Sequence, residues 1–273
     1  MGISVSFIST TLNEEKNVNK ASSSIFSQSY ESFEWVIVDD GSTDRTVAKL
    51  RKRFGGDSRV RIFTPGRLGR SGALNYAVER ARGVYIANHD FDDVSYSERL
   101  SIQTRVLDEN SDLGVVGGDH VAVDRQRDER YIRRQPRRHD QIVRAMSRYI
   151  PLAHTIATFR KEAWEEVGGY PEAENAIDMR FWIRLINAGW KMRNPSEVIG
   201  EHFVYSESFW NKNFHYAYRQ YDLARLNARI IRDQNLPAWM YIYPFSRLLY
   251  GGLPPRLKRY IRRMLGGSTE EDV

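Results

Sequence analysis

The fold is decided by a strand, a turn and a helix that follow one another in FEWVIVDDGSTDRTVAKLRKRF, residues 33–54. The run FEWVIV is short, apolar and rich in β-branched side chains, which is typical of a buried strand. DDGSTD has the composition of a turn. In the segment that follows, Val47, Leu50 and Phe54 fall on one helical face. A buried strand followed by an amphipathic helix indicates half of a parallel βαβ unit.

The same pattern recurs on both sides of this unit. Strands are expected at 3–8, 59–63 and 83–87, with helices between them at 13–28, where Asn13 is the expected N-cap, and at 71–82. Strands that alternate with helices of roughly ten to fifteen residues indicate a parallel sheet. We therefore predict an α/β fold with a mostly parallel central sheet flanked by helices.

After residue 100 the alternation loosens. Short strands and helices are still expected, among them LGVVGG as a strand and DMRFWIRLINAG as a helix. We expect one domain over 1–205, divided near residue 100, and an extension over 206–273 that is mainly helical, aromatic and basic.

The composition excludes several classes of site. The chain has 273 residues and no cysteine, which rules out disulfides, thiolate metal sites and cysteine nucleophiles and fits a cytoplasmic protein. The sequence shows no signal peptide and no apolar stretch of about 18 residues, so no transmembrane helix is expected.

Positive charge gathers in two places in a chain of net charge +6, at 125–148 and at 254–267. Such clusters favour a phosphorylated ligand, a nucleic acid or an anionic membrane surface. The second cluster, PPRLKRYIRRMLGG, predicts a basic amphipathic helix. Two interpretations of this helix are open. In the first, the helix lies on an anionic membrane and the protein is peripheral on the cytoplasmic face. In the second, the helix packs on the domain or on a second subunit.

Polar side chains follow three of the expected strands. They are Thr10 and Thr11, then Asp39 and Asp40, then Asp90, Asp92 and Asp93. In open α/β sheets ligands bind at the carboxyl ends of the strands, so these groups should converge on one edge. An Asp-x-Asp-Asp stretch offers hard oxygen ligands for Mg²⁺ or Mn²⁺, although a solvated turn is the alternative.

Taken together, four stretches resemble the successive motifs of family 2 inverting glycosyltransferases with the GT-A fold. They are VSFISTTLNEE, WVIVDDGSTDRT, GRSGALNYAVERARGVYIANHDFDD and EEVGGYPEAENAIDMRFWIRLINAGWKM, and the resemblance covers residues 3 to 195. It implies a nucleoside-diphosphate sugar donor, a divalent metal (Mn²⁺ or Mg²⁺) and inversion at the anomeric carbon. It also implies a nucleotide-binding half over 1–100 and an acceptor-binding half over 101–205.

The resemblance assigns roles to single residues. Asp92 is expected on the metal, with Asp93 in support. In the donor site, Thr10 and Asp40 are expected to contact the base and the ribose, with Asp39 beside them. Asp90 is expected near the ribose, and Arg70 is the expected basic contact to the donor. Leu12 and Glu14, from the first motif, are also expected to bind the donor.

The expected general base is Asp178, in AIDMRFW. It would take a proton from an acceptor hydroxyl, which attacks the anomeric carbon from the face opposite the nucleotide. Ile177 and Arg180 stand where the family often has acidic residues, and an arginine partner would lower the pKa of Asp178.

Three further side chains, His154, Trp182 and Arg180, are candidates for acceptor or sugar contacts. His202 is out of register with the family's metal-proximal histidine, and we interpret it as an ordinary packing residue.

Other functions fit less well. A metal-dependent sugar nucleotidyltransferase would need a glycine-rich phosphate loop after the first strand, where STTLNEE has no glycine. A nucleic-acid-binding protein would need a reader motif, and none is recognised. A non-catalytic sugar-nucleotide-binding relative would not need the retained acidic motifs. UDP is the expected nucleotide of the donor, with GDP next. The expected acceptor is a glycan or a polyprenyl-phosphate-linked molecule. The sequence specifies no oligomeric state.

Overall fold

The computed structural model describes residues 3–125, 128–173, 175–204, 217–254 and 257. The strands are β1 (Val5–Thr11), β2 (Phe33–Asp39), β3 (Val60–Phe63), β4 (Tyr85–Asn88), β5 (Val94–Ser95), β6 (Leu113–Val116), β7 (Asp119–Asp124), β8 (Glu129–Arg133), β9 (Thr158–Arg160), β10 (Lys191–Arg193) and β11 (Val198–Val204). The α-helices are α1 (Val18–Phe26), α2 (Thr46–Phe54), α3 (Gly69–Arg80), α4 (Arg99–Asp108), α5 (His139–Ala145), α6 (Lys161–Glu166), α7 (Ile177–Asn187), α9 (Ala217–Asp233) and α10 (Ile242–Gly252).

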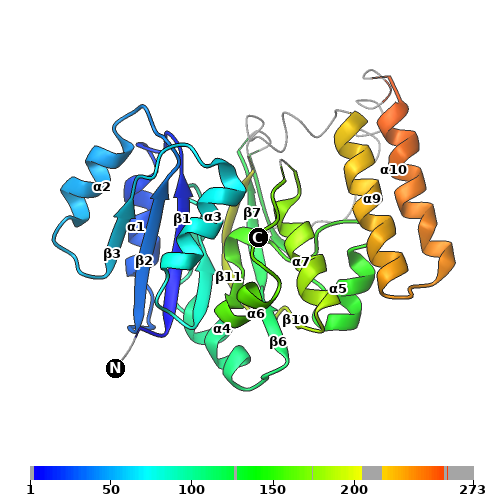
Figure 1. The fold of residues 1–273 in the computed structure, drawn as a ribbon, viewed down its shortest axis with the longest axis horizontal. Helices are drawn as coiled ribbons and strands as arrows, with labels where there is room; N and C mark the ends of the chain where they lie inside the picture. The colour runs from blue at the N-terminus through cyan, green and yellow to red at the C-terminus, as the bar shows by residue number, and fades with distance from the viewer. Residues whose placement is uncertain (1–2, 126–127, 174, 205–216, 255–256, 258–273) are drawn as a thin grey trace.

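The larger sheet confirms the α/β prediction. Its strand order is β10-β6-β9-β4-β1-β2-β3. The pairs among β1, β2, β3 and β4 are parallel, as is β6 with β10, whereas β9 runs antiparallel between β4 and β6. Figure 1 shows β1, β2 and β3 with α1, α2 and α3 around them. The carboxyl ends of β1, β2 and β4 therefore lie at one edge of this sheet.

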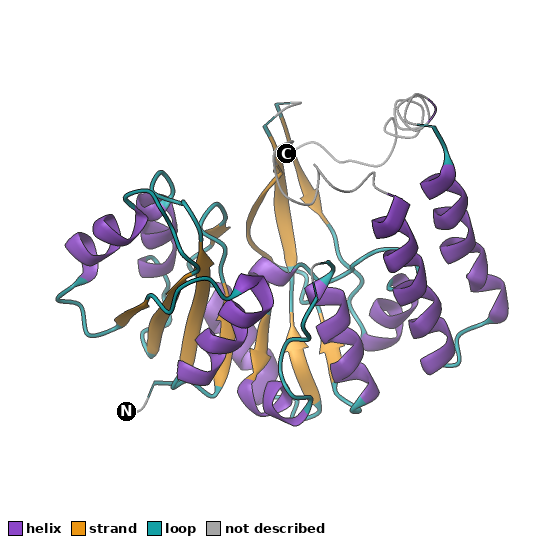
Figure 2. Ribbon diagram, turned by 45° about the horizontal axis from the view of Figure 1, so that its top comes forward, coloured by secondary structure: helices purple, strands orange, loops and turns teal. Residues whose placement is uncertain are grey.

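A second sheet, in the order β5-β11-β7-β8, stands beside the first and was not expected from the sequence. In Figure 2 its long strands rise above the layer of the larger sheet. Strand β5 begins at Val94, directly after the acidic stretch, and pairs with β11. This pairing brings the end of β11 next to the aspartates that follow β4.

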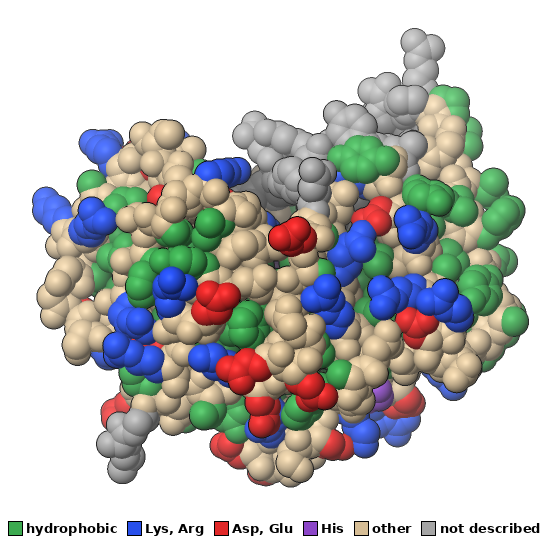
Figure 3. All heavy atoms as spheres, viewed as in Figure 1, with side chains coloured by type: hydrophobic (Ala, Val, Ile, Leu, Met, Phe, Trp, Pro, Cys, Tyr) green, Lys and Arg blue, Asp and Glu red, His purple; other side chains and the backbone are tan. Residues whose placement is uncertain are grey.

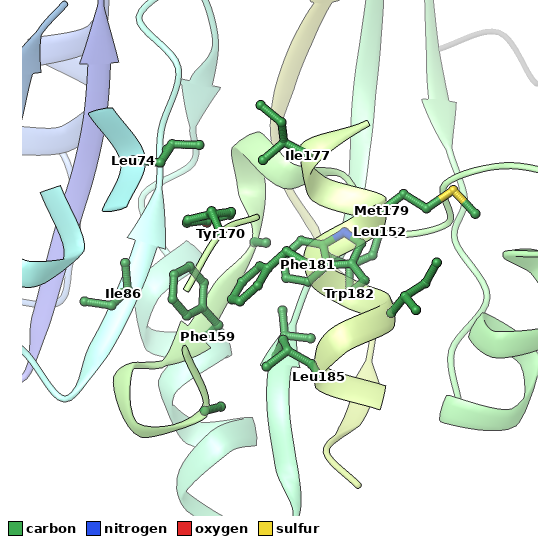
Figure 4. Packing of buried hydrophobic residues seen from close by; sticks show 14 of the residues in the cluster. Leu74, Ile86, Leu152, Phe159, Tyr170, Ile177, Met179, Phe181, Trp182 and Leu185 are labelled. Carbon is green, nitrogen blue, oxygen red and sulfur yellow. The ribbon is translucent and has the colours of Figure 1, made fainter. Parts of the chain in front are cut away.

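Two hydrophobic clusters pack on opposite faces of the larger sheet, because alternate residues of each strand point to opposite sides. Ile8 and Ile86 belong to one cluster, with side chains from α3, α6, α7 and α9. Phe7 and Ala87 belong to the other, with side chains from α1, α2 and α4. Figure 4 shows the first cluster, in which Phe159, Tyr170 and Phe181 lie side by side.

One local expectation was wrong. Asn13 is not the N-cap of α1, which begins at Val18 after Asn17. Asn13 has a left-handed backbone (φ 59°). Its Oδ1 accepts a hydrogen bond of 2.8 Å from the Thr43 N–H, so it ties the loop after β1 to the turn after β2.

The C-terminal helices α9 and α10 lie side by side in both ribbon views. Leu223, Leu226 and Ile230 of α9 belong to the first cluster, so α9 shares the core of the preceding chain. Within the described part of the chain, no helix is both long and apolar enough to cross a membrane. The boundary expected at residue 205 stays a prediction, and most of the basic segment 254–267 lies outside the described residues.

Candidate functional site

The ends of β1 and β2 present two buried polar atoms that have no hydrogen-bond partner among the described residues. Thr11 and Asp39 face each other in the strand register. Asp39 Oδ2 accepts hydrogen bonds from the Gly41 N–H (3.2 Å) and the Ser42 N–H (2.9 Å), in a turn where Gly41 has a φ of 89°. No described residue bonds to Asp39 Oδ1 or Thr11 Oγ1. Because buried polar groups are normally satisfied, this pair is suited to a polar ligand.

Asp40 is already engaged by the protein. Its Oδ1 accepts hydrogen bonds from the Leu68 N–H (2.6 Å) and the Gly69 N–H (3.0 Å), and Arg67 lies 3.5 Å from its Oδ2. The carboxylate therefore holds the backbone turn at the start of α3. The sequence predicted that Asp40 contacts the base and the ribose and that Asp39 lies beside it. In the described part of the structure, however, the carboxylate oxygen without a hydrogen-bond partner is Asp39 Oδ1.

The rest of the first motif lies around this pair. Thr10 is half-buried and Leu12 is exposed. Glu14 accepts a hydrogen bond of 2.6 Å from the Asn17 side chain. Burial raises the pKa of Glu14, and Asp90 adds to the shift. Glu14 is thus one of several carboxylates that gather at this edge.

Arg70 connects the donor side of the site to the expected base. It lies in the first turn of α3, with Nη2 3.3 Å from Asp90 Oδ2. The Asp90 carboxylate raises the pKa of Arg70, and Asp178 adds to this shift. One guanidinium therefore lies in the field of carboxylates from two distant segments.

Asp92 has the properties of a cation ligand. Burial and the neighbouring carboxylates of Asp93, Asp90 and Glu14 raise its pKa to about 7. No described side chain donates a hydrogen bond to its carboxylate, while Lys20 Nζ donates to its backbone carbonyl. A divalent cation would relieve this crowding of negative charge.

Within the described residues no group of three or more acidic or histidine side chains forms a metal cage. One or two carboxylates are enough for Mg²⁺ or Mn²⁺, because these ions keep waters and also bind substrate phosphates. The residues present therefore fit such an ion.

Asp93 has a structural role instead. It is 1% exposed and accepts hydrogen bonds from the Phe203 N–H (2.9 Å) and His202 Nδ1 (3.0 Å). Burial lowers the pKa of His202, but Asp93 outweighs it and raises the value to about 9. His202 is thus an ion-pair partner inside the acidic corner and not an ordinary packing residue. Only the pairing of β5 with β11 reveals this contact.

Asp178 lies in the first turn of α7 and is half-buried. Burial raises its pKa, and the opposing effects of the Met179 N–H and Arg70 do not cancel this. Arg180 turns away from it, with Nη2 2.5 Å from Asp222 Oδ1 on α9. The expectation that an arginine at 180 lowers the pKa of Asp178 is therefore wrong, because that arginine is paired elsewhere.

His154 packs against Tyr170 and Trp182. His154 Nε2 is 3.0 Å from the Tyr170 hydroxyl, and its ring centroid is 6.0 Å from that of Trp182. Burial and Arg70 lower the pKa of His154 to about 3, so the ring is neutral. Trp182 is fully buried and belongs to the cluster drawn in Figure 4, whereas His154 is half-buried.

The chain is similar to known glycosyltransferases. The model of glycosyl transferase family 2 matches residues 6–168. The putative glycosyltransferase EpsE of Bacillus subtilis (strain 168) is 28% identical over 98% of this chain and 97% of its own. The O-antigen biosynthesis glycosyltransferase WbnJ of Escherichia coli is 30% identical over 75% of this chain and 81% of its own.

Solved structures share the fold. The mannosyltransferase PcManGT of Pyrobaculum calidifontis, in complex with GDP-Man and Mn²⁺, has a TM-score of 0.68 at 21% identity, covering 98% of this chain and 77% of its own. TarS 1–349 of S. aureus, in complex with UDP-GlcNAc, has a TM-score of 0.67 at 18% identity, covering 97% of this chain and 73% of its own.

Proposed function

The chain belongs to glycosyl transferase family 2, and on that premise we propose that it transfers a sugar from a nucleoside-diphosphate donor to an acceptor with inversion at the anomeric carbon. The chain is a glycosyltransferase with the GT-A fold. UDP is the proposed nucleotide, with GDP next, and solved relatives of this fold hold UDP-GlcNAc and GDP-Man. The acceptor is a hydroxyl or phosphate of a glycan, and the name of the E. coli relative supports a glycan.

The observation that carries this proposal is the ion pair of Arg70 with Asp90, at a site where the Arg70 charge also acts on Asp178. Arg70 Nη2 lies 3.3 Å from Asp90 Oδ2 at the acidic corner, and its charge also lowers the pKa of Asp178, so one guanidinium acts on both carboxylates. A donor diphosphate can pair with the guanidinium there. A general base is most effective when its pKa lies near the working pH, and burial raises the pKa of Asp178 towards neutral pH.

Each step uses a group of this chain. Asp39 Oδ1, which has no partner in the described part of the chain, accepts a hydrogen bond from the nucleotide, and Arg70 binds the diphosphate. Asp178 takes the proton of the acceptor hydroxyl, whose oxygen attacks the anomeric carbon opposite the nucleotide. Asp92 would hold Mn²⁺ or Mg²⁺, which offsets the charge of the leaving diphosphate. A lipid-linked acceptor and a location on the cytoplasmic face of a membrane remain part of the proposal, supported by the basic sequence at 254–267.

The test separates donor binding from chemistry. Thermal shifts with a panel of UDP- and GDP-sugars in Mn²⁺ identify the donor, and its turnover is then measured. Asp178→Asn is expected to bind this donor within a few-fold of the wild type and to lose about 10²- to 10⁴-fold in turnover. Asp140→Asn, on the exposed surface of α5, is the matched control and should keep full turnover. Full turnover by Asp178→Asn would contradict the assigned base.

A further inference from the structure

The outer face of α10 and of the 3₁₀ turn before it, Ala238–Tyr241, is apolar and exposed. Trp239, Ile242, Phe245 and Leu249 are 63%, 60%, 59% and 58% exposed. Their spacing at i, i+3, i+6 and i+10 places them in one stripe. Figure 3 shows hydrophobic side chains gathered along the edge that α10 forms, with lysine and arginine side chains beside them over α9. We call these four residues the apolar stripe.

The apolar stripe is separate from the side of this segment that packs on the protein. The inner side of the same segment is already packed, since Met240 and Pro244 are buried. Arg247 is the single charged residue in 238–252. It turns inward and donates hydrogen bonds to the Arg148 carbonyl (2.7 Å) and Gln220 Oε1 (3.2 Å). A contiguous apolar surface of this kind marks a site of interaction.

A basic hollow lies next to the stripe. Its volume is about 510 Å³, and it is lined by Gln135, Pro136, Arg137, Gln141, Arg144, Ala145, Arg148 and Tyr149. Arg137 is neutralised by Asp119, 2.7 Å away. Arg144 and Arg148 are exposed, and neither has an acidic partner among the described residues. Both arginines line this hollow, so an anion bound in it would offset their charges.

Ring contacts join the hollow to the stripe. The Arg148 guanidinium carbon lies 4.7 Å from the centre of the Tyr243 ring. The Tyr243 ring centre is 5.9 Å from that of Trp239. Arg148 and the exposed tryptophan therefore belong to one continuous surface.

We propose that this surface docks on an anionic phospholipid bilayer. The apolar stripe enters the boundary between headgroups and acyl chains, where tryptophan is favoured, and Arg144 and Arg148 bind a lipid phosphate at headgroup level. A second copy of the chain would bury the stripe but would leave this arginine pair uncompensated unless it supplied acidic groups. The basic sequence at 254–267 directly follows α10 and would add attraction to the same anionic surface.

The experiment measures vesicle binding by the full chain and needs no transferase activity, so its result is independent of the proposed reaction. Flotation with vesicles of phosphatidylcholine alone, or with phosphatidylglycerol added, separates neutral from anionic surfaces. The wild type is expected to float with the anionic vesicles. Phe245→Ser with Leu249→Ser should weaken this binding at least tenfold, because two apolar side chains no longer insert. Arg144→Gln with Arg148→Gln should weaken it about tenfold or more, and only on anionic vesicles.

Matched controls change the same residue types away from this surface. Val84→Ser removes an apolar side chain that is 62% exposed, and Arg51→Gln with Lys52→Gln removes two exposed charges of α2. Both controls should bind as the wild type does. Brominated lipids should quench the fluorescence of the wild type, and the quenching should be lost in Trp239→Phe.

Three outcomes would overturn the proposal. The first is that the wild type fails to bind anionic vesicles. The second is that the stripe and arginine variants bind like the wild type while Arg262→Gln with Arg263→Gln abolishes binding, which would place docking in the C-terminal segment. The third is that light scattering shows a dimer that the stripe variants dissociate, which would assign the stripe to a second copy.

Discussion

Replacing Arg180 by glutamine is expected to weaken the attachment of α9 and to leave the pKa of Asp178 unchanged. The Arg180 and Asp222 side chains are 29% and 23% exposed, and their charged atoms lie 2.5 Å apart. Arg180 Nε also donates to the Asn175 carbonyl at 3.1 Å. A charged hydrogen bond contributes about 1.5–3 kcal/mol when buried, and exposed ion pairs contribute about 0.2–1 kcal/mol. For this partly exposed pair we expect a loss of about 1–2 kcal/mol in the free energy of unfolding.

Two measurements test this reasoning. Urea unfolding of Arg180→Gln, Asp222→Asn and the double variant should give a coupling energy of about 1 kcal/mol. The pH dependence of kcat/KM reports the pKa of the base in the free enzyme. Arg70→Gln should move the acidic limb of this profile to higher pH, because Arg70 lowers the pKa of Asp178. Arg180→Gln should leave the limb in place, and a shift as large as that of Arg70→Gln would refute our account of the base.

Asp40→Ala should cost about 2–4 kcal/mol in urea unfolding, because two backbone N–H groups lose a buried charged acceptor. Asp39→Asn should change stability less and weaken donor binding in calorimetry about tenfold, the effect of losing one charged hydrogen bond; unchanged affinity would argue against the open acceptor. The pKa of His202 is raised to about 9, so its pairing with Asp93 stabilises the fold below about pH 6.5 and this contribution is lost as the pH rises through 9. His202→Gln should therefore reduce the difference in Tm between pH 6.5 and pH 9.5, and an undiminished difference would exclude this ion pair as its source. EDTA should abolish transfer, and Mn²⁺ should restore it. Asp92→Asn should raise the Mn²⁺ concentration that is needed for the half-maximal rate. Insensitivity to EDTA would contradict a metal-dependent reaction.

Much of the fold was predictable because its signals are local. The run 33–38 and the helix after it have the hydrophobic periods of a strand and an amphipathic helix, and the structure confirms both. The parallel pairing of β1, β2 and β4 follows from helices placed between strands. The second sheet could not be predicted, because β5 has only two residues and its partner β11 lies more than 100 residues away.

Within the candidate site, residue types were predictable and partnerships were not. The sequence placed Asp39, Asp40, Asp90 and Asp92 at strand ends, because a strand followed by polar residues is visible in one dimension. It left open which carboxylates the protein itself engages. The contacts of Asp40 come from the turn before α3, and those of Asp93 come from β11.

By itself, then, the sequence determined the α/β class, the family and the acidic motifs, because hydrophobic period and motif order are properties of short segments. The tertiary structure decided which acidic groups the protein itself engages: among the described residues no side chain donates a hydrogen bond to Asp39 Oδ1 or to the Asp92 carboxylate, whereas Asp40 and Asp93 are engaged. It also decided that Arg180 pairs with Asp222 and that burial raises the pKa of Asp178. The physical reason is that desolvation and ion pairing depend on groups brought together from distant segments, and no local pattern in the chain encodes those distances.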